Sequence, residues 1–300
     1  MPLEKPLPLP TPQNLLPPSS TYHYFEGARQ RPFRANAVKC DPVNAWWLAE
    51  AAFLAYWDEP NVRRCYEQAG MATVKFLHGA STECYVASNE NFGIVSFRGT
   101  QVAEPNDPVS LAQMVTDLVI DAKWRQVSND TGGVVHQGFK EGLEEIWDPP
   151  VSGPGLRGYL EELRKAGPTQ CVWFTGHSLG GALAVLAAAR VQAVQGVYTF
   201  GAPKVGDRKF ADSYQVPTYR FVNNKDPVPD LPPSVPLVGH YVHVGEAYRF
   251  DAAGTLRSLS ASSDAGGWLG DRLGIRLRNP LDHAPICYAI KAWNWCVRQE

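Results

Sequence analysis

Hydrophobic residues recur at helical spacing in several segments of the chain, and short runs of β-branched and aromatic residues lie between these segments. In residues 43–57 the apolar positions fit a helix, and the Asp41-Pro42 pair before them is typical of a helix start. The other helical segments are residues 137–147, 155–165, 179–193 and 285–297. The short runs predict strands at residues 73–77, 84–87, 94–97, 171–174, 197–200, 218–222, 241–244 and 247–250.

The order of these elements indicates the fold class. Residues 171–174 are apolar at every position, which indicates a strand in a sheet that is covered on both sides. Strands interleaved with helices favour a mostly parallel sheet with helices on both faces. We therefore predict an α/β fold, with a single catalytic domain in residues 36–300.

Residues 1–35 are predicted to form a Pro-rich arm in front of this domain. Seven prolines lie among the first 20 residues, which favours extended chain. The same stretch lacks the apolar core of a secretory signal, and no apolar run reaches the ~20 residues that a transmembrane helix needs. We therefore expect no transmembrane segment, and a cytoplasmic protein or one exported without a leader. Residues 258–280, rich in Ser, Gly and Asp, are expected to form a loop.

Charge and cysteine content exclude some classes of protein. The chain has 28 Lys and Arg against 30 Asp and Glu, and a net charge of -2 provides no field to gather nucleic acid or an anionic membrane. The six cysteines form no C-x-x-C pair and no metal-ligand spacing. Without a visible export signal, we expect them to be reduced structural thiols.

A Gly-x-Ser-x-Gly motif is the main chemical signal in the sequence. Ser178 lies between an apolar strand and a long Ala-rich helix, with Gly176 and Gly180 on either side. A sharp turn from strand to helix exposes such a serine hydroxyl above the sheet, and the glycines allow the backbone to approach closely. The start of the helix also favours a developing negative charge. We predict that Ser178 is a nucleophile.

A serine nucleophile needs a base, and the base needs an acid that fixes its tautomer. In this type of fold the chain order is serine, acid, histidine. The candidate acids are Asp226 and Asp230, of which Asp226 directly follows a strand in a Pro-braced loop. The candidate bases are His240, His243 and His283, and His283 lies at the start of the closing helix, where a loop could bring it over the sheet edge. The remaining histidines precede the acid and are expected to be packing or surface residues: His23, His78, His136 and His177.

The third requirement is an oxyanion hole that stabilises the tetrahedral intermediate. One donor is expected to be the backbone N–H of Leu179, directly after the nucleophile. The second donor should come from a loop after an early strand. Gly99 follows such a strand and frees the backbone to direct the Thr100 amide inward. The alternative is an ordinary turn with Arg98 on the surface.

These motifs, in this order, resemble those of the class 3 lipases, the α/β-hydrolase family that includes the fungal triacylglycerol lipases. The resemblance extends from about Val43 to the end of the chain. It rests on five motifs, at residues 97–100, 135–139, 175–182, 199–206 and 223–233.

The resemblance implies an α/β-hydrolase fold and a serine carboxylester hydrolase that cleaves acylglycerol esters through an acyl-enzyme. It implies a triad of Ser178, Asp226 and His283, oxyanion donors at Thr100 and Leu179, and no metal or organic cofactor. The expected partner is a lipid or ester substrate, with peripheral contact at a lipid–water interface.

The resemblance also implies a lid between the oxyanion strand and the next element. Residues 101–118 occupy this place, and their apolar positions share one helical face: Leu111, Met114, Val115 and Leu118. Three alternatives remain open: a phospholipase, a short-chain or feruloyl esterase, and a non-catalytic α/β-hydrolase scaffold that binds a lipid or protein.

Overall fold

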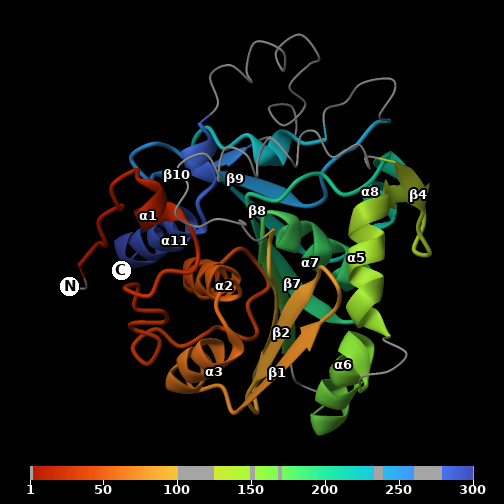
Figure 1. Cartoon of the computed structure of the whole chain (residues 1–300), viewed down its shortest axis with the longest axis horizontal. Helices are drawn as coiled ribbons and strands as arrows, with labels where there is room; N and C mark the ends of the chain where they lie inside the picture. Colours follow the sequence, from red (N-terminus) through yellow and green to blue (C-terminus); the bar gives the residue numbers. More distant parts are fainter. Residues whose placement is uncertain are drawn as a thin grey trace.

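An eight-stranded sheet forms the centre of the molecule (Figure 1). The computed structural model describes residues 3–100, 125–148, 153–167, 171–232, 239–259 and 279–299. In spatial order the strands are β1 (Thr73–His78), β2 (Glu83–Ser88), β3 (Phe92–Phe97), β6 (Cys171–His177), β7 (Val194–Phe200), β8 (Thr218–Asn223), β9 (Glu246–Phe250) and β10 (Leu256–Leu259).

The five central strands run parallel to one another. β3 pairs with β6, β6 with β7, β7 with β8 and β8 with β9, all in parallel register. At the two edges of this sheet the pairing is antiparallel: β1 with β2, β2 with β3, and β9 with β10. Because the carboxyl ends of parallel strands meet at the same edge, the loops after β3, β6 and β8 lie on one side of the molecule.

Helices cover both faces of the sheet, which confirms the predicted α/β-hydrolase architecture. One face is covered by α2 (Pro42–Leu54), α3 (Glu59–Gln68) and α11 (Pro285–Arg298), and the other by α5 (Gln137–Trp147), α6 (Gly155–Ala166) and α7 (Leu179–Ala189), as Figure 1 shows. Each layer contributes its apolar side chains to a separate core cluster on its own side of the sheet.

Helix α2 lies at the centre of the first layer. Its start is fixed by Asp41, whose side chain accepts hydrogen bonds from the backbone N–H groups of Val43 and Asn44, and by Pro42 at the first helical position. Every residue from Val43 to Leu54 is buried. A helix buried on all sides needs cover on its outer face as well as on its sheet face.

The N-terminal segment provides part of this cover, and from Pro12 onward it is packed against the domain rather than extended. A short helix, α1 (Pro12–Leu15), is followed by buried Tyr24, Phe25 and Phe33, all within the same core cluster as α2. Tyr22 also donates a 2.6 Å hydrogen bond to Glu50 on α2. The prolines near the start indicated extended chain, but the apolar area of these aromatic residues stabilises a packed segment instead.

Other elements differ from the sequence-based expectations. Residues 241–244 do not form a ladder strand, and Val242 makes only an isolated bridge to Gly206. Helix α7 ends at Ala189 rather than at residue 193, and Ala193 has a positive φ of 57° before β7 begins. The sequence did not indicate α3 or β10, nor α8 (Arg208–Ser213), β4 (Gln126–Ser128) and β5 (Val134–His136). The expected lid at residues 101–118 and most of the expected loop at 258–280 lie outside the described residues.

Two further expectations concern reduced cysteines and the lack of a transmembrane segment. All six cysteines are free, and burial raises the pKa of the Cys84 thiol and brings that of Cys40 to about 12. Thiols with raised pKa values are poor nucleophiles, which is consistent with a structural role. Within the described parts of the chain, no helix is both long and apolar enough to cross a membrane.

Candidate active site

Ser178 lies at a strained turn between β6 and α7. Its φ of 56° and ψ of -130° are unusual for any residue other than glycine. The backbone is too crowded here for side chains at the flanking glycines. A Cβ added at Gly176 would lie 2.2 Å from the carbonyl carbon of Gly180, and a Cβ added at Gly180 would lie 2.3 Å from the carbonyl oxygen of Phe97. The turn therefore has the geometry that the Gly-x-Ser-x-Gly motif predicts.

Backbone hydrogen bonds fix this turn in the sheet. The Ser178 N–H donates to the Phe200 carbonyl on β7 at 3.0 Å, and the Ser178 carbonyl accepts from the Gly181 N–H at 3.0 Å. Leu179 is the first residue of α7. The first N–H groups of a helix have no carbonyl partner within the helix, and the helix dipole makes this end positive. The Leu179 amide is thus suited to stabilising an oxyanion.

Asp226 and His283 form a fully buried pair. The Nδ1 atom of His283 lies 2.8 Å from Oδ2 of Asp226, and both side chains have no exposed surface. Asp226 follows the end of β8, and its Oδ1 accepts a 2.9 Å hydrogen bond from the Val228 N–H. The Tyr288 hydroxyl donates to Oδ2 at 2.6 Å. Three donors thus hold the carboxylate in a fixed orientation.

The loops that carry this pair are tied to each other. His283 ends a 3₁₀ turn, η3 (Pro280–His283), which leads into α11. The neighbouring Asp282 carboxylate accepts from Asn224 Nδ2 at 2.9 Å and from the Lys225 N–H at 3.2 Å, and its carbonyl accepts from Asn223 Nδ2 at 2.8 Å. Burial raises the pKa of Asp282, and the donors from Lys225 and Asn224 oppose this effect.

Ser178 Oγ and His283 Nε2 are both buried, and neither has a hydrogen-bond partner among the described residues. With Nδ1 of His283 donating to Asp226, Nε2 carries a free lone pair. His177, the residue before Ser178, places its ring 4.4 Å from the ring of His283. The fold therefore brings an unpaired hydroxyl and an unpaired imidazole nitrogen to the same edge of the sheet.

The loop after β3 packs directly against the serine turn. β3 and β6 are neighbours, with Phe97 opposite Gly176. An added Cβ at Gly99 would lie only 2.0 Å from Tyr56 Oη and 2.7 Å from the His177 carbonyl oxygen. Thr100, which follows, is half-buried. Arg98 is half-buried and forms an ion pair with Glu83 on β2.

The alternative acid and bases lie in other interactions. Asp230 ends a 3₁₀ turn, η1 (Val228–Asp230), and its carbonyl accepts from Lys204 Nζ at 2.8 Å. His243 donates from Nε2 to the Pro229 carbonyl at 2.7 Å, and burial followed by the charges of Arg220 and Lys204 lowers its pKa well below the usual range. His240 is exposed. Of the candidates, Asp226 and His283 lie within hydrogen-bond distance of each other.

Three residues of the site were not assigned a role by the sequence reasoning: Tyr56, His177 and Tyr288. Tyr56 lies just beyond α2, and no motif marks it. His177 was expected to be a packing or surface residue, and it is buried with both ring nitrogens in hydrogen bonds. Among the described residues, no group of three or more His, Cys, Asp or Glu side chains could hold a metal ion.

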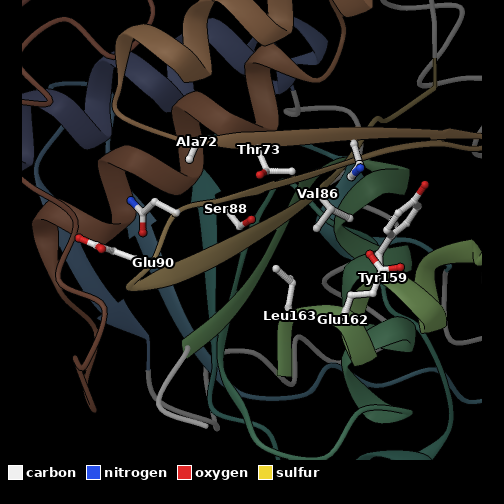
Figure 2. A pocket seen from close by; sticks show the side chains of 10 residues that line it. Ala72, Thr73, Val86, Ser88, Glu90, Tyr159, Glu162 and Leu163 are labelled. Atoms are coloured by element: carbon white, nitrogen blue, oxygen red, sulfur yellow. The ribbon is translucent and has the colours of Figure 1, made fainter. Parts of the chain in front are cut away.

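A cavity of about 410 Å³ lies elsewhere, between β1, β2 and α6 (Figure 2). Its lining combines the apolar Val86 and Leu163 with the carboxylates Glu90 and Glu162. The lining includes none of the predicted site residues.

Comparisons with known proteins find similarity to lipases. The model of the lipase (class 3) family matches residues 94–235. The secreted mono- and diacylglycerol lipase 1 of Fusarium solani is 37% identical over 123 residues, 39% of this chain and 34% of that protein. The toxin TseL of Vibrio cholerae is 48% identical over 203 residues, 56% of this chain and 30% of that protein.

A solved structure of the Rhizomucor miehei triacylglyceride lipase is also similar, with a TM-score of 0.53 and 28% identity over 70% of this chain and 79% of that chain. The fold is that of the α/β-hydrolases, and Ser178 occupies a sharp strand-to-helix turn within it. Over residues 94–235, just under half of its length, the chain is similar to the class 3 lipase family. The matched regions span about a third of the length of the curated relatives.

The comparisons correct the expected compartment. The Fusarium solani relative is a secreted lipase, which contradicts the expectation of a cytoplasmic protein. That expectation rested on the missing apolar leader in the first residues, and this feature is no guide to the compartment here.

Proposed function

We propose that this chain is a serine carboxylester hydrolase that cleaves acylglycerol esters through an acyl-enzyme intermediate. The observation that carries the proposal is the 2.8 Å contact between His283 Nδ1 and Asp226 Oδ2, at the sheet edge where Ser178 occupies a strained turn. A buried carboxylate of this kind holds the imidazole in the tautomer that leaves Nε2 free to accept a proton.

In the first half of the reaction, Ser178 Oγ attacks the ester carbonyl carbon as its proton moves to His283 Nε2. The backbone amides of Thr100 and Leu179 stabilise the oxyanion of the tetrahedral intermediate. The bond from carbon to the alcohol oxygen then breaks, and His283 returns the proton to the leaving alcohol. Asp226 stabilises the imidazolium that exists between these two proton transfers.

In the second half, a water molecule replaces the alcohol. His283 takes a proton from the water as its oxygen bonds to the acyl carbon, and the same amides stabilise the second oxyanion. The bond to Ser178 Oγ breaks, His283 returns the proton to the serine, and the acid is released. The whole cycle thus uses residues of this chain, the ester and one water molecule.

The relatives support acylglycerols as the substrate class. One relative is a mono- and diacylglycerol lipase, and a similar solved structure is a triacylglyceride lipase. Phospholipids, short-chain esters and feruloyl esters use the same chemistry, so they are the alternative substrates. A panel of p-nitrophenyl esters of increasing acyl length, a triglyceride and a phospholipid separates these classes by their kcat/KM values. A phospholipid preferred over every acylglycerol would overturn the proposed substrate class.

Fluorophosphonate labelling tests the catalytic proposal against a non-catalytic scaffold. The probe forms a covalent bond only with an activated serine, so the wild-type protein should be labelled once, at Ser178. Ser88→Ala, which removes a buried serine on β2, should be labelled as the wild type. Absence of an adduct on the folded wild-type protein would leave the scaffold as the better description.

Residues 101–118 are proposed to form a lid that opens at a lipid–water interface. An apolar helical face in this position would gain a partner when it meets a lipid surface. The rate of ester hydrolysis should then rise abruptly as a sparingly soluble ester passes its solubility limit. A smooth saturation curve through that limit would argue against the lid.

A further inference from the structure

His177, directly before the predicted nucleophile, bridges two other parts of the molecule. Its Nδ1 lies 2.8 Å from the hydroxyl oxygen of Tyr56, and its Nε2 lies 2.6 Å from the backbone carbonyl oxygen of His283. Both Tyr56 and His177 are buried. One imidazole thus connects the end of α2, the serine turn and the loop of the predicted base.

The partners of His177 determine its tautomer. A carbonyl oxygen can only accept, so Nε2 must carry the proton that is donated to His283. In the neutral ring Nδ1 then accepts from the Tyr56 hydroxyl. Burial, followed by the nearby His283, lowers the pKa of His177 well below its usual range, so the ring stays neutral. Nε2 therefore remains the donor to the His283 carbonyl, and Nδ1 remains the acceptor from the Tyr56 hydroxyl.

Tyr56 extends this connection to the predicted oxyanion loop. Any residue other than glycine at position 99 would clash with the Tyr56 hydroxyl, because its Cβ would lie only 2.0 Å from the hydroxyl oxygen. Burial raises the pKa of Tyr56, and the charge of Arg98 and the backbone N–H of Gly99 oppose this effect. The phenol therefore stays protonated and contacts Gly99, next to Thr100.

We propose that Tyr56 and His177 are positioning residues, which hold the oxyanion loop and the base loop in fixed places on either side of Ser178. The inference rests on the proposed ester hydrolysis. Ser178 Oγ and His283 Nε2 have no hydrogen bond that aligns them, so their alignment depends on the backbone around them. Asp226 holds the ring of His283, and His177 holds its carbonyl.

This role predicts a specific kinetic signature. Neither side chain reacts with the substrate, so their loss should misalign the transition state more than it weakens substrate binding. A misplacement of about 1 Å can lower a rate on the order of 100-fold. The contact of His283 with Asp226 would remain, so the pH at which activity is half-lost should stay the same.

The test uses Tyr56→Phe in the full-length protein, with Tyr66→Phe as the matched control. Tyr66 is also a fully buried tyrosine, on α3, and its hydroxyl lies 3.1 Å from Ser96 Oγ, away from the site. Fluorophosphonate titration gives the concentration of competent sites, and p-nitrophenyl butyrate gives kcat per site. Tyr56→Phe should lose on the order of 10- to 100-fold in kcat per site with little change in KM. Tyr66→Phe should keep the wild-type kcat per site.

Two substitutions of His177 test the other end of the connection. His177→Gln keeps an N–H that can donate to the His283 carbonyl, and His177→Leu keeps neither contact. We expect kcat per titrated site to decrease from wild type to His177→Gln to His177→Leu. A purely structural role would instead lower the titrated fraction and the melting temperature, and leave kcat per site unchanged.

The outcomes separate this inference from the proposed function. Wild-type labelling and turnover, combined with a wild-type kcat per site in Tyr56→Phe and in His177→Leu, would overturn the positioning role alone. A shifted pH midpoint in Tyr56→Phe would also overturn it, because the tyrosine would then act on the charge of the base. A folded wild-type protein that neither reacts with the probe nor hydrolyses esters would overturn the proposed function itself.

Discussion

The hydroxyl of Tyr288 donates a 2.6 Å hydrogen bond to Oδ2 of Asp226, the same oxygen that lies 2.8 Å from Nδ1 of His283. The Tyr288 oxygen also accepts a 2.9 Å hydrogen bond from the Asn223 N–H, at the end of β8. Burial, and then the charge of Asp226, raises the pKa of Tyr288, so the phenol remains a donor. Tyr288 therefore ties the carboxylate to the strand that precedes it.

Replacing Tyr288 with Phe should weaken both stability and turnover. The buried Asn223 N–H would lose its acceptor, which should lower the free energy of unfolding by about 1–3 kcal/mol. Asp226 would lose one of its three donors, and kcat should fall on the order of tenfold through misalignment of His283. Urea unfolding and ester kinetics measure the two effects. A wild-type kcat would show that Tyr288 has no part in orienting the carboxylate.

Asp226→Asn and Asp230→Asn decide between the two acids that the sequence offered. An amide at position 226 would favour the wrong tautomer of His283, and kcat should fall on the order of 10⁴-fold, as in comparable triads. Asp230 meets Lys204 through its carbonyl, outside the pair, so Asp230→Asn should keep the wild-type kcat. A large loss of kcat in Asp230→Asn, with a wild-type kcat in Asp226→Asn, would instead make Asp230 the acid.

Ser178→Ala should separate activity from stability. The serine hydroxyl is buried without a partner among the described residues, so its removal should leave the free energy of unfolding unchanged or raise it by about 1 kcal/mol. At the same time kcat should fall on the order of a million-fold. Thermal unfolding and turnover of one p-nitrophenyl ester are sufficient to measure both. Near-native turnover in this variant would exclude Ser178 as the nucleophile.

Gly99→Ala should displace the oxyanion loop. The new methyl group would stand 2.0 Å from Tyr56 Oη and 2.7 Å from the His177 carbonyl oxygen, and overpacking of this kind lowers the free energy of unfolding by about 1–3 kcal/mol. We expect a clear loss of kcat as well. Gly167→Ala is the control, since a Cβ at Gly167 meets no atom within 4 Å.

Combining Gly99→Ala with Tyr56→Phe measures the contact between the two residues. The double variant removes the hydroxyl that the methyl group would strike, so its loss of stability should be smaller than the sum of the two single losses. Strict additivity would mean that the two side chains do not interact.

The neutral His177 makes a prediction about acid stability. Its pKa is lowered in the folded state, so below a pH of about 6.5 the unfolded chain binds a proton that the folded chain does not. The free energy of unfolding should therefore decrease as the pH falls below this value, by up to about 1.4 kcal/mol per pH unit for this histidine. His177→Gln should remove that part of the slope. Urea unfolding between pH 5 and 7 measures this slope, and an unchanged slope in His177→Gln would contradict the prediction.

Local sequence patterns were sufficient for those parts of the site that depend on short-range geometry. The Gly-x-Ser-x-Gly turn is determined by glycines within two residues of Ser178, and the structure shows the expected crowding there. Asp226 could be preferred over Asp230 because it directly follows β8. His283 could be preferred because it comes just before the last helix.

Tyr56 could not be predicted, because its contacts depend on how a whole helix packs. Gly99 and His177 lie more than 40 residues from Tyr56 along the chain. Tyr56 contacts them only because α2 packs on the sheet. The N-terminal segment escaped prediction for a related reason: its prolines are visible locally, but the surface that Phe25 and Phe33 cover exists only in the folded domain. The edge strand β10 has only four residues, two of them polar, so its sequence carries no clear strand pattern.

Because α2 is completely buried, a fragment of this chain must include α2 to fold as a unit. The family match at residues 94–235 contains Ser178 and Asp226, but it omits α2, α11 and His283. A fragment cut to that match would lack the layer that contains Trp46 and Trp293, whose rings pack 4.9 Å apart. One face of the sheet would then lie bare, and such fragments would adhere to one another instead of folding.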